Sequence, residues 1–136
     1  MKKSVSGKAV VERLGETPGP YSYAIETTGK TIYIAGQVAL MNGKVVSEGD
    51  FGAQYRHILE NIRIVLQAAG ASMDDVVKLV HYVVPEMRTS SPEFKSLVEV
   101  RREFFHERFP VSTLVRVAGL LFEGLLIEVD AWAVVD

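Results

Sequence analysis

The chain has no cysteine, which excludes disulfide bonds, thiolate metal ligands and a cysteine nucleophile. A cysteine-free chain suits a reducing compartment. No apolar run follows the basic residues 1–4, and no run in the chain is long enough to cross a bilayer. We therefore expect no secretory signal, no membrane partner and a cytoplasmic location.

Excess positive charge and nucleotide-binding motifs are also missing. Fifteen basic and seventeen acidic residues give a formal net charge of −2, whereas nucleic-acid binders usually carry a basic surplus that releases phosphate counterions. There is no Gly-rich phosphate loop, dinucleotide fingerprint or nucleophile elbow. His57, His81 and His106 lack metal-ligand spacing. We expect no nucleic-acid partner, metal or cofactor, and we interpret His81 as a satisfied strand residue rather than a general base.

The residues that are present predict one α+β domain over residues 1–136. An apolar stripe over residues 51–69 predicts a helix, with Asp50 as its N-cap and Gly70 at its end. Ser91 and Pro92 open a second helix, with Ser91 as N-cap. Asn42-Gly43 predicts a type I′ hairpin turn. Alternating or β-branched runs predict strands over residues 9–11, 21–27, 32–35, 76–84, 111–117 and 125–135.

The expected element order is therefore β-β-β-α-β-α-β-β, with both helices on one face of a six-stranded, largely antiparallel mixed sheet. The other face needs a cover if its residues are apolar. Leu114, Leu126, Trp132 and Val134 indicate that some are. Large apolar patches usually mark an interface, so we hypothesise an oligomer packed through the open sheet face.

Four segments together resemble the Rid family, also called YjgF or the reactive-intermediate deaminases. They are Gly19-Pro20-Tyr21-Ser22, Ala35-Gly36-Gln37-Val38, residues 54–78, and the end from Phe109-Pro110 through residues 127–131. The resemblance implies a chorismate-mutase-like fold and a homotrimer with small-molecule clefts between subunits. It also implies cofactor-free hydrolysis of enamine and imine intermediates. Some relatives carry the labels endoribonuclease or translation inhibitor.

The chain departs from the family pattern at the residue that binds the substrate carboxylate. The family has an arginine two residues after Phe-Pro, whereas this chain has Ser112 two residues after Phe109-Pro110. A hydroxyl supplies no charge, and loss of a charged, desolvated contact typically costs about 2–5 kcal/mol. Arg116 lies on the same strand face, about 13 Å further along. It is either a surface charge or a relocated anion site.

The remaining candidate residues follow from the same resemblance. Asp130 stands at the family's water-positioning glutamate, and it is either that group or a solvated strand acid. Tyr21 either lines the cleft or packs in the core. Gly36 and Gln37 would act through their backbone, and Leu114 replaces a frequent cysteine, which makes the expected cleft more apolar.

We therefore expect a cleft in which Asp130, Tyr21 and Ser112 act on the substrate, with Gly36, Gln37, Leu114 and Arg116 as ligand-binding candidates. One hypothesis is hydrolysis of imines other than the usual α-imino acids. A second is a ligand-binding trimer without chemistry. A third is a ribonuclease, for which the sequence shows neither paired acid and base groups nor a basic groove.

Overall fold

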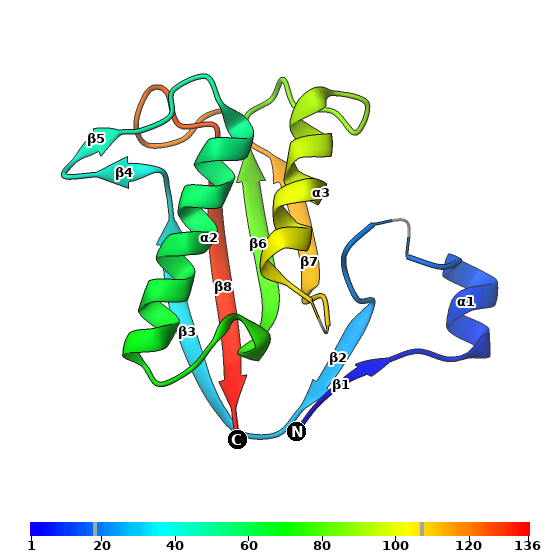
Figure 1. Ribbon diagram of the computed structural model, residues 1–136. Coiled ribbons are helices and arrows are strands. Elements are labelled where there is room, and N and C mark those ends of the chain that lie inside the picture. Colours follow the sequence, from blue (N-terminus) through cyan, green and yellow to red (C-terminus); the bar gives the residue numbers. More distant parts are fainter. Residues whose placement is uncertain (18, 107) are drawn as a thin grey trace.

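The central sheet has four strands, in the order β3–β8–β6–β7 (Figure 1). The computed structural model describes residues 1–17, 19–106 and 108–136. The strands are β3 (Lys30–Gln37), β6 (Val76–Val83), β7 (Val111–Arg116) and β8 (Ile127–Val135). β8 pairs antiparallel with both β3 and β6, and β6 pairs parallel with β7. The parallel pair is possible because a helix carries the chain from the end of β6 back to the start of β7.

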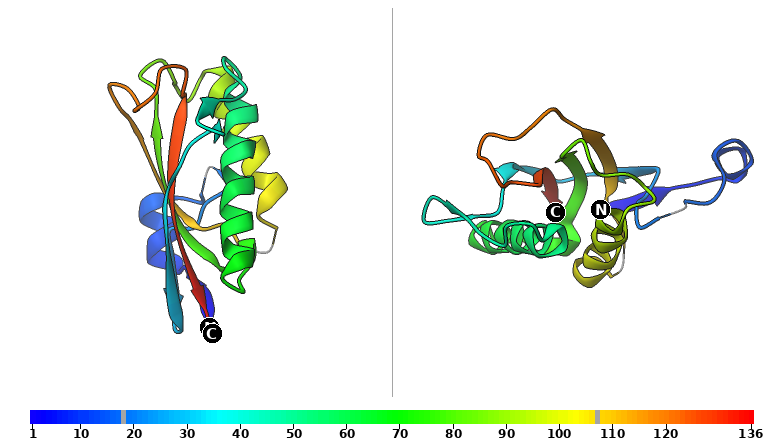
Figure 2. Two further views of the ribbon diagram at one scale, coloured as in Figure 1. Left: turned by 90° about the vertical axis from the view of Figure 1, so that its left-hand side faces the viewer. Right: turned by 90° about the horizontal axis from the view of Figure 1, so that it is seen from above.

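Two helices cover one face of this sheet and leave the other bare (Figure 2). They are α2 (Phe51–Ala68) and α3 (Pro92–Phe104), and a 3₁₀ turn, η1 (Met73–Asp75), leads into β6. The expected N-cap of α2 is confirmed, because the Asp50 carboxylate accepts a hydrogen bond from the Ala53 amide at 3.0 Å. Ser91 occupies the expected N-cap position of α3, but its side chain forms no capping hydrogen bond. Its hydroxyl instead bonds to the backbone of Arg88.

The core lies between the sheet and α2. Ile58, Leu59 and Ile62 are fully buried against the inward residues of β6 and β8. Gln54 is also fully buried, although its side chain is polar. Its amide nitrogen donates to the Gly124 carbonyl at 2.9 Å, and its oxygen accepts from the Leu126 amide at 2.9 Å. This side chain therefore fixes the loop that leads into β8.

The predicted hairpin is present as β4 (Leu40–Met41) and β5 (Lys44–Val45). Asn42 and Gly43 both adopt positive φ, at 52° and 76°. Positive φ at both central residues is what a type I′ turn requires.

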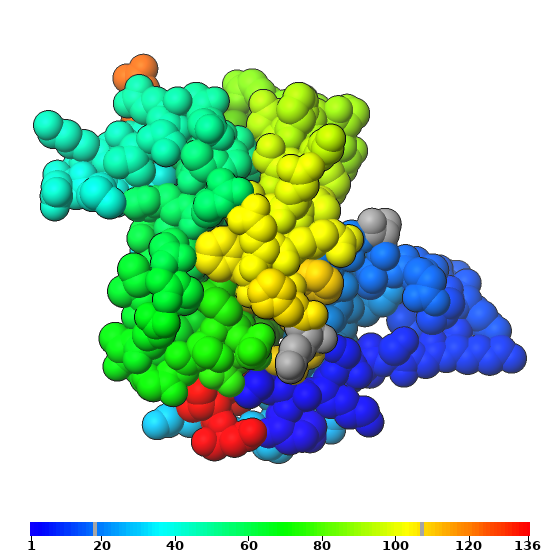
Figure 3. All heavy atoms as spheres, in the orientation of Figure 1, coloured from blue at the N-terminus to red at the C-terminus, as the bar shows by residue number. Residues whose placement is uncertain are grey.

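The N-terminal segment departs from the expectation. It forms β1 (Lys2–Val5), α1 (Lys8–Leu14) and β2 (Ala24–Thr27), with β1 paired only with β2. The strand predicted over residues 9–11 is wrong, because these residues lie in α1, which buries none of its side chains. The sheet of six strands is also wrong for the described part of the chain. β2 reaches the four-stranded sheet only through a bridge between Ser22 and Val111, and the segment stands out to one side (Figure 3).

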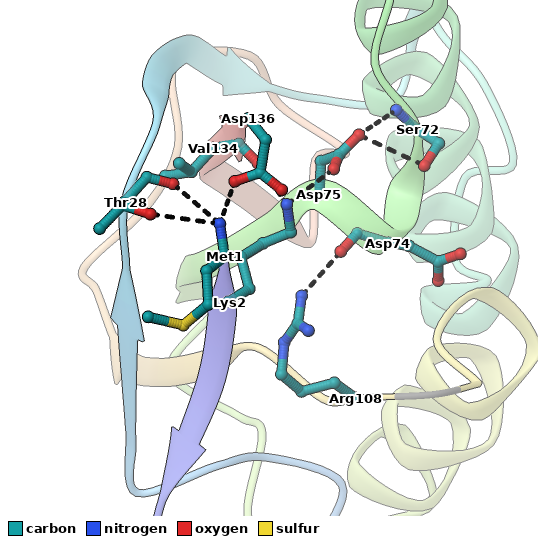
Figure 4. A network of polar contacts seen from close by, with 9 residues as sticks. All are labelled: Met1, Lys2, Thr28, Ser72, Asp74, Asp75, Arg108, Val134 and Asp136. Atoms are coloured by element: carbon teal, nitrogen blue, oxygen red, sulfur yellow. Dashed lines mark hydrogen bonds and ion pairs between the residues drawn. The ribbon is translucent and has the colours of Figure 1, made fainter.

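Polar contacts hold the start of this segment against the end of the chain (Figure 4). The Met1 ammonium group contacts the Asp136 carboxylate and the Thr28 carbonyl. The Lys2 ammonium group bonds to the Val134 carbonyl at 2.8 Å and to Asp75 at 3.0 Å. Desolvation raises the pKa of Asp75, but hydrogen bonds and the Lys2 charge outweigh it, so this pKa lies below its usual value.

Candidate functional site

Three of the predicted site residues line one cavity between β7 and α3. Tyr21, Ser112 and Leu114 border this space, which has a volume of about 360 Å³. Most of the remaining wall is apolar and comes from Pro20, Phe94, Leu97 and Val98. Within one chain, the space beside Ser112 is therefore lined mostly by apolar side chains.

The loop before β2 holds Tyr21 at this position. The Ser22 hydroxyl donates to the Phe109 carbonyl at 2.5 Å, and the Ser22 amide donates to the Pro110 carbonyl at 3.2 Å. These bonds fasten the loop to the start of β7, so Tyr21 lies next to Ser112. The ring of Tyr21 also packs edge-on against Tyr23, at 5.8 Å between centroids. Of the two interpretations of Tyr21, the structure supports the one in which it lines a cavity.

A second group of predicted residues lies on the opposite face of the sheet. Glu128 and Asp130 alternate along β8 with Val129 and Ala131, which are buried beneath the helices. The two carboxylates therefore point to the bare face. Ser112 and Leu114 pair with Leu79 and His81, whose buried side chains mark the helix-covered face. A single chain thus keeps Asp130 away from Ser112, and the structure does not bring the three predicted catalytic residues together.

Gly36 makes room for these two carboxylates. A Cβ at this position would lie 2.5 Å from Glu128 Oε2 and 3.0 Å from Asp130 Oδ1. The register of β3 shifts between Ile34 and Gln37, which is the signature of a bulge. The Gln37 amide nitrogen bonds to the Ala35 carbonyl at 3.1 Å. Gly36 therefore permits the close approach of two acids, whose side chains a Cβ at this position would displace.

The two acids differ in their contacts. The Tyr82 hydroxyl donates to Asp130 Oδ2 at 3.0 Å. Partial burial raises the pKa of Glu128, and the Asp130 carboxylate raises it further. A glutamate of raised pKa can serve as a proton donor beside a second carboxylate.

Arg116 does not reach the cavity at Ser112. It lines a neighbouring hollow with Met87 and Arg88, and its guanidinium group donates to the Pro85 carbonyl at 3.2 Å. The side chain is exposed. The structure therefore supports the interpretation of Arg116 as a surface charge.

Sequence reasoning missed Arg101, which lines the Ser112 cavity and is only 4% exposed. The only cation that the sequence analysis considered for this cleft was Arg116. A signal was present, because Phe94, Leu97, Val98 and Arg101 follow helical spacing. This spacing places Arg101 on the same face of α3 as the apolar residues that line the cavity.

His81 lies beneath this arginine and is fully buried. Its Nδ1 lies 3.1 Å from the Thr113 carbonyl, and its Nε2 lies 2.9 Å from the Tyr55 hydroxyl. Burial, and then the positive charge of Arg101, lower the pKa of His81 to about 3. The prediction of a satisfied strand histidine is confirmed.

Comparison with known proteins agrees with this fold. The model of the family described as Endoribonuclease L-PSP matches residues 13–135. A RutC family protein of Pyrococcus horikoshii is 38% identical over 117 residues, which are 85% of this chain and 86% of that protein. The 2-iminobutanoate/2-iminopropanoate deaminase of Homo sapiens is 31% identical over 118 residues, 85% of this chain and 80% of that protein.

A crystal structure of a Rid family protein from Yersinia pestis matches with a TM-score of 0.83 and 30% identity, covering 98% of both chains. The fold defines a small α+β protein with two helices on one face of a mixed sheet. The chain belongs to the Rid (YjgF) family.

Within the described residues, no helix is both long and apolar enough to span a membrane.

Proposed function

We propose that this chain hydrolyses a small imine or enamine to a carbonyl compound and ammonia. An enamine first takes up a proton at carbon and becomes the imine. Water then adds to the imine carbon, the carbon–nitrogen bond breaks, and the nitrogen leaves as ammonia. Family membership supports this reaction class, because relatives of this chain are named 2-iminobutanoate/2-iminopropanoate deaminases.

The carboxylate pair at the bulge of β3 carries the proposal. Asp130 retains a carboxylate oxygen for a water molecule, because the described contacts give it one hydrogen bond, from Tyr82. Glu128 binds its proton more tightly than an ordinary glutamate. Asp130 would accept the proton of the attacking water, and Glu128 would donate a proton to the departing amine. Tyr21 and Ser112 would orient the substrate from the other side.

We further propose that copies of this chain assemble through the bare sheet face, as the homotrimer that the family resemblance implies. Tyr33 is 77% exposed and Val115 is 41% exposed on that face. Exposed apolar groups on a sheet favour such burial. Because β7 is an edge strand, packing that reaches over this edge of the sheet would bring Asp130 of a second copy toward the cavity at Ser112.

A ribonuclease, as in the description of the family model, finds less support in this chain. The formal net charge of −2 gives RNA no general attraction. A ligand-binding trimer without chemistry is the second candidate. The specific observation in its favour is the apolar wall of Leu114 and Val98 beside Ser112.

The test combines the purified protein with imines generated in place by an amino-acid oxidase, while ammonia release is followed. Asp130→Asn should lower turnover by about 10²–10⁴-fold, the usual contribution of a positioned general base. Asp74→Asn removes an exposed carboxylate on the turn before β6 and should leave turnover unchanged. Thermal stabilisation by small ligands without turnover of any imine would instead favour the binding trimer.

A further inference from the structure

Arg101 carries a charge that its surroundings do not balance. Its side chain extends from α3 into the space between the helix and the sheet and is only 4% exposed. A buried charge is costly unless it is paired. Among the residues that the structure describes, no carboxylate forms an ion pair with Arg101. The same guanidinium group borders the cavity of Tyr21 and Ser112.

The protein atoms that hold the guanidinium group are all neutral. Nε donates to the Tyr55 hydroxyl at 3.2 Å, and Nη1 donates to the Pro20 carbonyl at 3.3 Å. Nη2 lies 3.0 Å from His81 Nε2. These contacts fix the position of the group without cancelling its charge.

The tautomer of His81 follows from its neighbours. The Thr113 carbonyl, 3.1 Å from Nδ1, can only accept, so Nδ1 must carry the proton. Nε2 is then an acceptor, and it faces the donors of Arg101 and Tyr55. A second proton on the ring would face the guanidinium group directly. His81 is therefore a neutral support that leaves the arginine fully charged.

Two donors of Arg101 remain for a ligand. A guanidinium group has five N–H bonds: one is on Nε, and two are on each Nη. The described contacts use one on each nitrogen, which leaves one N–H on Nη1 and one on Nη2. Two adjacent N–H donors match the two oxygens of a carboxylate.

The cavity beside these donors fits a small ligand with an apolar body. Its volume is about 360 Å³, and Phe94, Leu97 and Leu114 provide much of its wall. The Ser112 hydroxyl makes one long described contact, 3.5 Å from His81 Nδ1. Its proton is therefore free to donate to the same ligand.

We propose that Arg101 is the specificity-determining residue of this cavity, binding a small carboxylate through Nη1 and Nη2 with Ser112 as a secondary donor. This inference rests on the proposed function, because it names the substrate class of the same site. Ser112 on β7 supplies no positive charge to the cavity. Arg101 on α3 then supplies that charge from the other side of the cavity. The substrate is accordingly an anionic imine rather than a neutral one.

Calorimetric titration with 2-oxobutanoate and with its methyl ester tests the inference without any turnover. The wild-type chain should bind the acid at least about 30-fold more tightly than the ester, which is the lower range for a charged, desolvated contact. Arg101→Gln should bind both with similar affinity. Arg102→Gln, the same change at the exposed neighbour on α3, should retain the preference. Equal affinities in the wild type, or a preference that survives Arg101→Gln, would overturn the inference.

A direct measurement covers the case in which Arg101→Gln does not fold. In the ¹⁵N NMR spectrum of the wild-type chain, the Arg101 side-chain signals should shift on addition of the acid and stay in place with the ester. Unmoved signals at saturating acid would overturn the inference. The results distinguish failure of the role of Arg101 from failure of the proposed hydrolysis. Carboxylate preference without imine turnover defeats only the hydrolase, and turnover without carboxylate preference defeats only the role of Arg101.

Discussion

The two faces of the sheet hold charges of opposite sign in different surroundings. On the helix-covered face, Arg101 is buried and every described partner is neutral. On the bare face, Glu128 and Asp130 are partly exposed and stand side by side at a glycine. One chain thus holds a half with a buried cation and a half with two acids, and its own sheet keeps the two halves apart. The hydrolysis proposed above therefore depends on the packing of one copy against another.

The largest expected effect comes from preventing that packing. Tyr33→Asp places a charge at a side chain that is 77% exposed on the bare face. Burial of an unpaired carboxylate is unfavourable, so the variant should sediment as a monomer. Turnover should fall to background, since the two halves no longer meet.

Ile64→Asp provides the matched control, because Ile64 is 54% exposed on α2 and lies away from the bare face. It should change neither sedimentation nor turnover. A Tyr33→Asp monomer with wild-type turnover would show that one chain suffices.

The next effect compares the stability lost on removing one tyrosine hydroxyl from the helix-covered side of the sheet and one from the bare face. Tyr55→Phe removes the acceptor of Arg101 Nε and a neighbour of His81 in a fully buried cluster. We expect a loss of about 3 kcal/mol in the free energy of unfolding, because a buried charged donor loses its partner. Tyr82→Phe removes only the bond to Asp130 on the bare face and should cost no more than about 0.5 kcal/mol. Urea unfolding of both variants measures the difference, and equal losses would contradict it.

A smaller effect, visible only in acid, comes from His81. Its pKa of about 3 in the folded chain lies below the ordinary value of 6.5, so the unfolded chain binds the proton first. The stabilisation is fully present above about pH 6.5 and is lost as pH falls toward 3. Between about pH 7.5 and pH 5, the wild-type chain should lose roughly 2 kcal/mol from this group.

His81→Gln should remove this acid-dependent loss, because glutamine does not titrate. His57→Gln, at a half-buried histidine of α2, should retain it. The measurement is urea unfolding at both pH values and one protein concentration. An unchanged loss in His81→Gln would mean that other groups cause it.

Local patterns predicted the parts of this fold that depend on local physics. Asp50 and the apolar stripe specify α2, and Asn42-Gly43 specifies the turn, since each needs only a few neighbouring residues. Residues 9–11 failed because a short apolar run suits a strand or a helix equally. The separation of β1 and β2 from the main sheet depends on distant pairing that no local pattern encodes.

The site was predictable residue by residue but not as an arrangement. The family pattern indicated Tyr21, Ser112 and Asp130, yet it could not show that the sheet separates them. Arg101 was missed because it precedes another charged residue, Arg102, and such pairs usually lie on solvated helix faces. Only its spacing from the apolar residues of α3 distinguished the buried arginine from the exposed one.

The contact between the Met1 ammonium group and the Asp136 carboxylate has a practical consequence for protein engineering. Chain ends that lie together can be joined by a short linker, and the chain can be reopened at an exposed turn. The turn at Asn42 and Gly43 is exposed and lies away from the Ser112 cavity. A circular permutant opened there would start at Gly43, and its native cavity would be bordered by the same residues in a new chain order.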